Sequence, residues 1–378
     1  MKHKTTKPEV LMISKPIVPP WDDSAKNIVA SQVTRGERYS YRILTDKSAP
    51  SLAPSVISDP IYPGRGTYSA GIVQNLRVML YGLRSRGAAI YHYFFAPNPI
   101  TSMAGRLQKH IARVKTVQTV CSAPASYDGI GRFLFADLTI VLSDNTRRLM
   151  IEAGVDSSKL RLVKPCVEPI DRPSQAQRLE TRRAYDLPEN GPVILFPGDY
   201  EFSSAAHTVA QAVPQLAEKF GDIKIVFACR IKREPSRVIR DKLKSDLQTA
   251  GHGDRVEFID HVSNMPALAG AADVVVMPAD SLYAKMDVPL VLLEAMSQHV
   301  PLVIAESAPL NELLSFEAGL GVPPGEPEAL AGAVTRILQN SSLGKELGKS
   351  GAQAVRRSFS ADTMARAIET IYDEVLEK

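Results

Sequence analysis

Residues 281–307 are SLYAKMDVPLVLLEAMSQHVPLVIAES and contain a loop, a helix and a strand in succession. Pro289 suits the first position of the helix, because the N–H that proline lacks would have no helical partner there. The run LVLLEAMSQ that follows is mostly apolar, which is typical of a helix inside a protein. PLVIAES then reads as a buried strand. This order indicates one repeat of a parallel sheet covered by helices.

The same alternation extends in both directions from this segment. In the second half of the chain we expect strands at 192–198, 223–229, 256–262, 273–279 and 301–307, and almost continuous helix after residue 326. In the first half we expect strands at 10–14, 39–45, 89–95, 114–120, 138–143 and 160–165, separated by helices such as 68–86 and 144–153. The predicted fold class is therefore α/β, with two Rossmann-like doubly wound domains.

A polar, proline-containing stretch separates the two halves. It ends in the Gly-Pro step at 191–192, which is typical of a linker. We therefore predict an N-terminal domain over residues 1–168, a linker over 169–191, a second domain over 192–358 and a last helix over 359–378. The length of 378 residues agrees with two domains.

The composition excludes several classes of protein. Hydrophobic residues make up 44% and charged residues 23%, which is ordinary for a globular protein and too apolar for a disordered one. No long apolar run and no signal peptide are seen, so we expect a cytoplasmic protein. Cys121, Cys166 and Cys229 lie far apart in apolar segments, which favours buried thiols over a zinc site.

Charge is divided unevenly along the chain. Residues 1–170 hold 23 Lys+Arg against 12 Asp+Glu, a balance of +11, whereas residues 171–378 hold 22 against 29, a balance of −7. The basic residues are dispersed, without an aromatic and basic platform, so nucleic-acid binding is not expected. Two readings stay open: the first domain faces an anionic acceptor or the inner face of a membrane, or its charges are simply solvated.

Glu294 is a carboxylate within the apolar helix that follows Pro289. Such a group is costly to bury without a partner, and the vicinal hydroxyls of a bound ribose would suit it. The backbone amides of Leu290 and Val291, at the start of the helix, would then receive a diphosphate. The alternative is a Glu paired with another residue at the edge of the core.

Two further segments of the second half are candidates for binding phosphate. After the strand at 192–198, a glycine turn leads into a helix and contains Gly198, Asp199, Ser203 and Ser204. Such a turn suits an anion, although a plain strand–turn–helix has the same pattern. After the strand at 223–229 come Arg230 and Lys232, which form either a phosphate clamp or a solvated basic turn.

In the first half, the candidates follow the first and third expected strands. SKPIVPPWDDSAKNIV, residues 14–29, lies between a strand end and a helix. Its Trp21, Asp22, Asp23 and Lys26 are the expected acceptor-binding residues, and Trp21 either stacks on a sugar ring or covers the sheet. His92 lies on a strand among aromatic residues, where a histidine is either a core residue or a ligand.

Several of these segments together resemble the retaining glycosyltransferases of family 4, which have the GT-B fold. PLVLLEAMSQHVPLVIA, residues 289–305, is similar to the second half of the family's donor-site motif. LFADLTIVLSDNTRRLMIEAGVDSSKLRLVKPCVEP, residues 134–169, resembles the passage from the first domain into the linker. IYHYFFAPN, residues 90–98, and DRVEFIDHVSNMPALAGAADVVVMPA, residues 254–279, resemble segments beside the donor sugar and the base.

The resemblance implies roles for individual residues. It places the ribose-binding carboxylate at Glu294, the base-contacting turn near Met265 and a sugar-lining histidine at His92. The chain departs from the motif at Met286, where the family has a second Glu, so Asp287 and the neighbouring Lys285 are expected to serve the donor instead. Asp199 and Ser204 stand where the family often has Arg and Lys, and Arg230 and Lys232 would supply that positive charge.

The function that this resemblance implies is sugar transfer, with retention, from a nucleoside diphosphate sugar to an acceptor hydroxyl. No Asp-x-Asp motif is present, so we expect no metal and no cofactor beyond the donor substrate. The acceptor is expected to be a small molecule, a saccharide or a lipid-linked group. The last helix is expected to cross back to the first domain. The alternatives are a sugar-nucleotide epimerase of the same fold and a non-catalytic sugar-nucleotide-binding protein.

Overall fold

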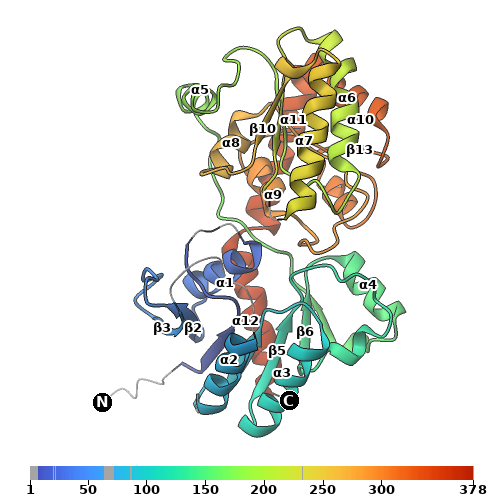
Figure 1. Ribbon diagram of the computed structural model, residues 1–378. Coiled ribbons are helices and arrows are strands. Elements are labelled where there is room, and N and C mark those ends of the chain that lie inside the picture. Colours follow the sequence, from blue (N-terminus) through green and yellow to red (C-terminus); the bar gives the residue numbers. More distant parts are fainter. Residues whose placement is uncertain are drawn as a thin grey trace. The chain divides into compact units, whose positions relative to one another are not determined.

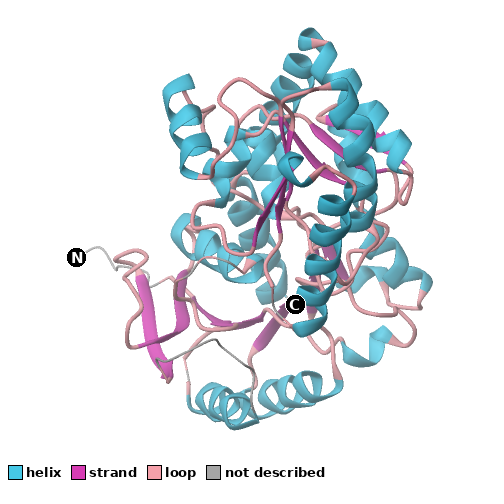
Figure 2. Ribbon diagram, turned by 45° about the horizontal axis from the view of Figure 1, so that its top comes forward, coloured by secondary structure: helices cyan, strands magenta, loops and turns pink. Residues whose placement is uncertain are grey.

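The computed structural model describes residues 7–19, 21, 23–63, 72–85, 87–231 and 233–377. The chain forms two units, each built around one parallel sheet. The first unit contains the chain up to Glu168 together with Ala284–Asp287 and Ser360–Lys378, and the second contains Pro169–Tyr283 and Val288–Phe359. Both units have their strands between layers of helices, as Figure 2 shows with strands in magenta and helices in cyan. Two doubly wound α/β domains are thus confirmed.

The first sheet is parallel throughout the pairings that the structure describes. Its strand order is β3-β2-β1-β4-β5-β6-β7, so the order reverses between β1 and β4. The strands are β1 (Glu9–Ile13), β2 (Ser40–Asp46), β3 (Val56–Tyr62), β4 (Ile90–Tyr93), β5 (Lys115–Thr119), β6 (Leu138–Val141) and β7 (Leu160–Leu162).

The helices of the first unit cover opposite faces of this sheet, as alternation along β1 requires. They are α1 (Ser24–Arg35), α2 (Ile72–Arg84), α3 (Pro99–Ala112), α4 (Asp144–Glu152) and the final helix α12 (Ala361–Glu377), with short turns η1 (Ile130–Phe133) and η2 (Ser157–Lys159). Leu11 and Ile13 pack with Val78 of α2, whereas Met12 contacts the hydroxyl of Tyr372 on α12. The final helix therefore belongs to the first unit, as expected.

The second sheet repeats this plan with the order β10-β9-β8-β11-β12-β13, again parallel in its described pairings. Its strands are β8 (Val193–Phe196), β9 (Lys224–Ala228), β10 (Val256–Ile259), β11 (Val274–Met277), β12 (Leu302–Ala305) and β13 (Gly319–Val322). The helices around it are α5 (Gln175–Ala184), α6 (Ala205–Lys219), α7 (Glu234–Thr249), α8 (Met265–Ala271), α9 (Leu290–Ser297), α10 (Pro327–Gln339) and α11 (Ser341–Ser358), with turns η3 (Gly253–Arg255) and η4 (Leu310–Phe316). Figure 1 labels most of them.

The segment 169–191, expected to be a linker, differs from the prediction. It lies in the second unit and contains α5, which starts with a capping box between Ser174 and Gln177. Arg182 is buried, donates to the Asp273 carboxylate at 2.8 Å and bonds the carbonyl oxygen of Ala271. The polar composition that suggested a linker therefore belongs to a helix held by an ion pair and hydrogen bonds.

Two edge strands were not expected from the sequence. In β3 the run VISDPIY contains Pro60, which an edge strand tolerates because one side of it needs no ladder hydrogen bonds. In β13 the run GLGV contains glycines, and a Cβ at Gly319 would meet the Leu302 carbonyl oxygen at 2.3 Å. The backbones of β12 and β13 therefore approach too closely for any residue but glycine at this position. The glycines also removed the apolar pattern by which a strand is recognised in the sequence.

Candidate nucleotide-sugar site

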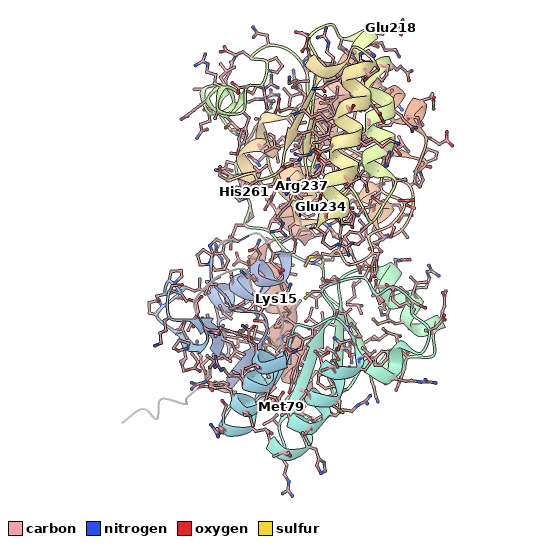
Figure 3. All side chains as sticks on the ribbon, viewed as in Figure 1. Lys15, Met79, Glu218, Glu234, Arg237 and His261 are labelled. Atoms are coloured by element: carbon pink, nitrogen blue, oxygen red, sulfur yellow. The ribbon has the colours of Figure 1, made fainter. Side chains whose placement is uncertain are left out.

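The carboxyl ends of the second sheet's strands carry most of the predicted donor residues. The strand order reverses between β8 and β11, and open α/β sheets bind ligands at such a point. Figure 3 shows Glu234 and Arg237 at the start of α7 and His261 after β10 at this end of the unit, with Glu218 of α6 at the opposite end. The loops after β8, β9, β10 and β11 therefore share one edge of the sheet.

Helix α9 follows the loop after β11 and is almost entirely enclosed. Val291 and Glu294 lie one turn apart, and they are the two α9 residues that are not fully buried. The helix begins after Pro289 without a side-chain cap. Among the described residues, no acceptor is recorded for the amides of Leu290 and Val291. The start of α9 thus offers backbone donors and the positive end of a helix dipole to an anion.

The Glu294 carboxylate lacks a partner in its own surroundings. No described residue forms a hydrogen bond or an ion pair with it. Burial alone raises its pKa to about 7, because no positive charge offsets the loss of water. The described residues therefore do not support the alternative, in which Glu294 pairs with another residue at the edge of the core. A carboxylate in this state is able to accept hydrogen bonds from a ligand hydroxyl.

The loop after β8 is ordered by its own hydrogen bonds. The Asp199 carboxylate accepts from the amides of Glu201 and Phe202 at 2.9 and 2.6 Å, so it closes the turn. The Ser204 amide donates to Asp280 of the loop after β11 at 2.9 Å, which ties the two loops at the reversal point. The buried Ser204 hydroxyl has no partner among the described residues.

Gly198 and Ser203 complete this turn before α6. A Cβ at Gly198 would lie 2.0 Å from the Phe196 ring, so the chain turns here only with glycine. The Ser203 hydroxyl accepts from the Ala205 amide at 3.4 Å, at the amino terminus of α6. The four predicted residues of the turn are thus together, with Asp199 held inside the turn.

The basic turn after β9 is only partly described. Arg230 is exposed, and Lys232 lies outside the described residues. The next basic residue of the turn, Arg233, pairs with Glu201 at 2.5 Å and lies over the Phe202 ring. Arg233 thereby connects the loops after β8 and β9 at the same edge. Met265, at the start of α8, is half-buried after the turn that follows β10.

In the first unit, the predicted acceptor residues surround the start of α1. Asp23 caps the helix by accepting from the amides of Ala25 and Lys26 and pairs with Lys15 at 2.6 Å. Burial alone would raise the pKa of Asp23, but Lys15 and the capping bonds hold it below its usual value. Trp21 is exposed, and Asp22 lies outside the described residues.

Lys26 and Lys15 differ in what they offer a ligand. Lys26 is buried, and its ammonium donates to the Val18 carbonyl oxygen at 3.1 Å, which makes it part of the local fold. Lys15, labelled in Figure 3, follows β1, and its side chain is 46% exposed. Lys15 lies within residues 14–29, where the acceptor-binding residues were expected, but it was not among the residues named there. Its ion pair with Asp23 makes it a further candidate.

The short segment Ala284–Asp287 belongs to the first unit rather than to the donor edge of the second. Asp287 is buried and accepts from the Ser143 hydroxyl at 2.6 Å, while burial raises its pKa. The Lys285 carbonyl oxygen accepts from the Ala123 amide at 2.9 Å, and Met286 is buried. Asp287 therefore already has a partner inside the protein, supplied by the residue that caps α4.

His92 is a core residue, contrary to the expectation that it lines a sugar site. Its side chain is 0% exposed. One ring nitrogen bonds the Tyr372 hydroxyl and the other the Thr119 hydroxyl, each at 2.7 Å. Burial lowers its pKa to about 3, so the ring is neutral at physiological pH. Both polar atoms are used within the protein, and none is left for a ligand.

The described residues contain no group of three or more His, Cys, Asp or Glu side chains placed to hold a metal ion. Cys121, Cys166 and Cys229 are buried free thiols, as expected from their apolar segments. No described helix is both long and apolar enough to cross a membrane.

Comparison with known proteins finds relatives of this chain. Residues 191–340 match the family "Glycosyl transferases group 1". The D-inositol 3-phosphate glycosyltransferase of Salinispora tropica is 31% identical over 241 residues, which are 62% of this chain and 47% of that protein. The chain spans about half the length of the curated relatives it matches.

Solved structures show the same fold over nearly the whole chain. Sucrose-phosphate synthase of Thermosynechococcus elongatus superposes with a TM-score of 0.77 at 19% identity, covering 98% of this chain and all of that one. The Anabaena protein HepE, solved in complex with UDP and glucose, gives a TM-score of 0.76 at 16% identity, covering 96% and 99%. The two units therefore have the architecture called GT-B.

Proposed function

Because residues 191–340 belong to the group 1 glycosyl transferases, we propose that this chain transfers a sugar from a nucleoside diphosphate sugar to an acceptor hydroxyl. The observation that carries this proposal is Glu294, a half-buried carboxylate without a partner among the described residues, on a helix whose first amides also have no acceptor there. A nucleoside diphosphate has a group for each: ribose hydroxyls for the carboxylate and phosphates for the amides.

The phosphate side of the donor would lie against two helix starts. Leu290 and Val291 supply amides at α9, and Ser204 supplies a buried hydroxyl before α6. Arg230, exposed after β9, adds positive charge at the same edge, as does Lys232 by its place in the sequence. Met265 would contact the base from the turn after β10.

The reaction needs charge stabilisation more than it needs a strong protein base. The bond between the anomeric carbon and the diphosphate oxygen breaks, and the leaving oxygen takes the electron pair. The acceptor oxygen bonds to the same face of the sugar, and its proton passes to the leaving phosphate. Arg230 and the α9 amides would stabilise the growing negative charge, so no metal is required in this scheme.

Uridine diphosphate is the first donor nucleotide to test. The fold neighbour HepE was solved with UDP and with UDP-glucose, although its low identity carries only the fold to this chain. Trp21, Asp23 and Lys15, at the carboxyl edge of the first sheet, are the residues we assign to the acceptor.

The test is a panel of UDP and GDP sugars, with release of the nucleoside diphosphate measured with and without acceptor alcohols. We expect acceptor-dependent release that chelators leave unchanged and a product with the donor's anomeric configuration. Interconversion of donor sugars without an acceptor would identify an epimerase instead. Binding of a nucleotide sugar without any turnover would point to a non-catalytic binding protein.

A further inference from the structure

Helix α3 presents its apolar residues to solvent and its polar residues to the protein. Ile100, Met103, Leu107 and Ile111 follow one another at helical spacing, and all four are exposed, Met103 to 70%. The buried positions of the helix are instead Ser102, Gly105 and Gln108. This is the reverse of an ordinary surface helix, which buries its apolar stripe.

Hydrogen bonds fix this orientation. The Gln108 amide group donates to the carbonyl oxygens of Val78 and Met79 on α2 and accepts from the Tyr93 hydroxyl at 3.0 Å. The Ser102 hydroxyl donates to the Phe133 carbonyl oxygen at 2.7 Å. Rotation of α3 to bury its apolar stripe would leave these buried groups without partners, which is unfavourable. The apolar face is therefore held outward.

Helix α2 extends the same surface. It lies beside α3 in Figure 1, and Gln108 bonds its backbone directly. Val73, Leu76 and Leu80 are exposed along it, Val73 to 72%. Seven large apolar side chains on two adjacent helices exceed the scattered exposure that is normal for a soluble surface. We call these seven residues the α2/α3 face.

The charged side chains on α2 and α3 themselves are all basic, although Asp137 pairs with Lys109 of α3 at 2.7 Å and Asp59 accepts from the Tyr81 hydroxyl of α2. Residues 60–127 contain eight Lys and Arg and no Asp or Glu. Arg77, Arg84 and Arg106 are exposed on the two helices themselves. Long cationic side chains beside an apolar stripe are typical of helices that lie in the headgroup region of a membrane, where the stripe enters the acyl boundary and the charges meet anionic lipids.

We propose that the α2/α3 face docks on an anionic lipid bilayer. A second copy of the chain fits less well, because a symmetric pairing would bring two basic surfaces together without a carboxylate from residues 60–127 between them. An apolar cavity of about 40 Å³ between the helices, lined in part by Met79, Phe95 and Ile100, reaches Ile13 at the carboxyl end of β1. The apolar surface thus continues toward the ligand-binding edge of the sheet. The proposal does not depend on sugar transfer.

The test is sedimentation of the full chain with phosphatidylcholine vesicles, with and without phosphatidylglycerol, at low and high salt. We expect binding to the anionic vesicles that weakens as salt rises. The double variant Met103→Ser/Ile111→Ser should bind at least about tenfold more weakly than the wild type. Both side chains are exposed, so removing them takes apolar area from the contact with the vesicle. Its unfolding curve should match the wild type.

Matched controls distinguish binding through the α2/α3 face from nonspecific adsorption to the vesicles. Val238→Ser removes an equally exposed apolar side chain from α7 of the second unit and should leave binding unchanged. Arg84→Glu should weaken binding to anionic vesicles, whereas Arg357→Glu in α11 should not. Absence of binding at low salt, or equal losses in variant and control, would overturn the proposal. So would self-association that Met103→Ser/Ile111→Ser abolishes, because the occupant would then be a second copy.

Discussion

His92 in the first unit is a fully buried titratable side chain and Glu294 in the second is a half-buried one, yet only Glu294 is available to a ligand. Each nitrogen of His92 bonds a hydroxyl at 2.7 Å, and burial lowers its pKa to about 3. Glu294 has no partner among the described residues, and burial raises its pKa to about 7. In both cases burial disfavours the charged form. The difference lies in whether the protein itself satisfies the group.

This comparison separates a structural residue from a site residue without reference to relatives. A buried polar group that the protein satisfies stabilises the fold, while one left unsatisfied costs stability and points to a ligand. The same criterion divides other candidates. Asp287 and Lys26 bond Ser143 and Val18 within their own unit, whereas the Ser204 hydroxyl and the first amides of α9 are unpaired in the described part of the chain.

The largest effect is expected from His92→Leu. Removing the ring leaves the buried Thr119 and Tyr372 hydroxyls without their partner, so the free energy of unfolding should fall by about 2–5 kcal/mol. Urea unfolding measures it. Affinity for a nucleoside diphosphate should stay unchanged where the variant is folded. The control His207→Leu, at an exposed position of α6, should cost little. A loss below the control's would contradict the structural role.

Glu294→Gln should raise the free energy of unfolding, whereas His92→Leu lowers it. Burial raises the pKa of Glu294 from 4.5 to about 7 in the folded state. Between pH 4.5 and pH 7 the folded protein therefore keeps a proton on Glu294 that the unfolded protein has released. The wild type therefore loses stability as pH rises from 4.5 to 7. Without ligand, the variant should be more stable by about 1–3 kcal/mol at pH 8 and equal at pH 4.

Thermal unfolding at the two pH values checks this sign. Glu218→Gln, which changes an exposed carboxylate at the far end of α6, should show no such pH dependence. If Glu294→Gln were destabilising at pH 8, the carboxylate would have a partner in the protein. The comparison with His92 would then fail.

The smallest effect is expected from Lys15→Ala. The pair with Asp23 is partly exposed, so it should contribute only about 0.2–1 kcal/mol to stability. Since the pKa of Asp23 is held low, this contribution is present above its ordinary value of 3.8 and is lost as pH falls. Denaturation at pH 7 and pH 3 measures it. An acceptor role would appear separately, as a raised KM for the acceptor.

The sequence predicted the fold well because buried parallel strands are short apolar runs between helices. It failed at β3 and β13, which are edge strands with Pro60 and with glycines, and at α5, whose polar residues looked like a linker. Glu294 was proposed because a carboxylate in an apolar helix is unusual and because the segment around it resembles a donor-site motif. His92 was misplaced, since a strand pattern says which face a side chain takes but not whether α12 supplies its partner.

The apolar stripe of α3 shows a further limit. An apolar stripe at helical spacing, such as Ile100, Met103, Leu107 and Ile111, ordinarily faces the core. The structure turns them outward because the other face carries Ser102 and Gln108, which find partners on neighbouring elements. Hydrogen bonds to residues distant in sequence decided the orientation, and no window of the sequence contains them.

Calorimetric titration of UDP into the wild type, Glu294→Gln and Glu218→Gln tests the central claim most directly. The wild type and Glu218→Gln should bind with equal affinity, and Glu294→Gln should lose about 1–3 kcal/mol of binding free energy, the range for a hydrogen bond to a charged group. The folded variant, more stable than the wild type at pH 8, excludes misfolding as the cause. Equal UDP affinity in all three proteins would contradict the assignment of Glu294 to the donor site.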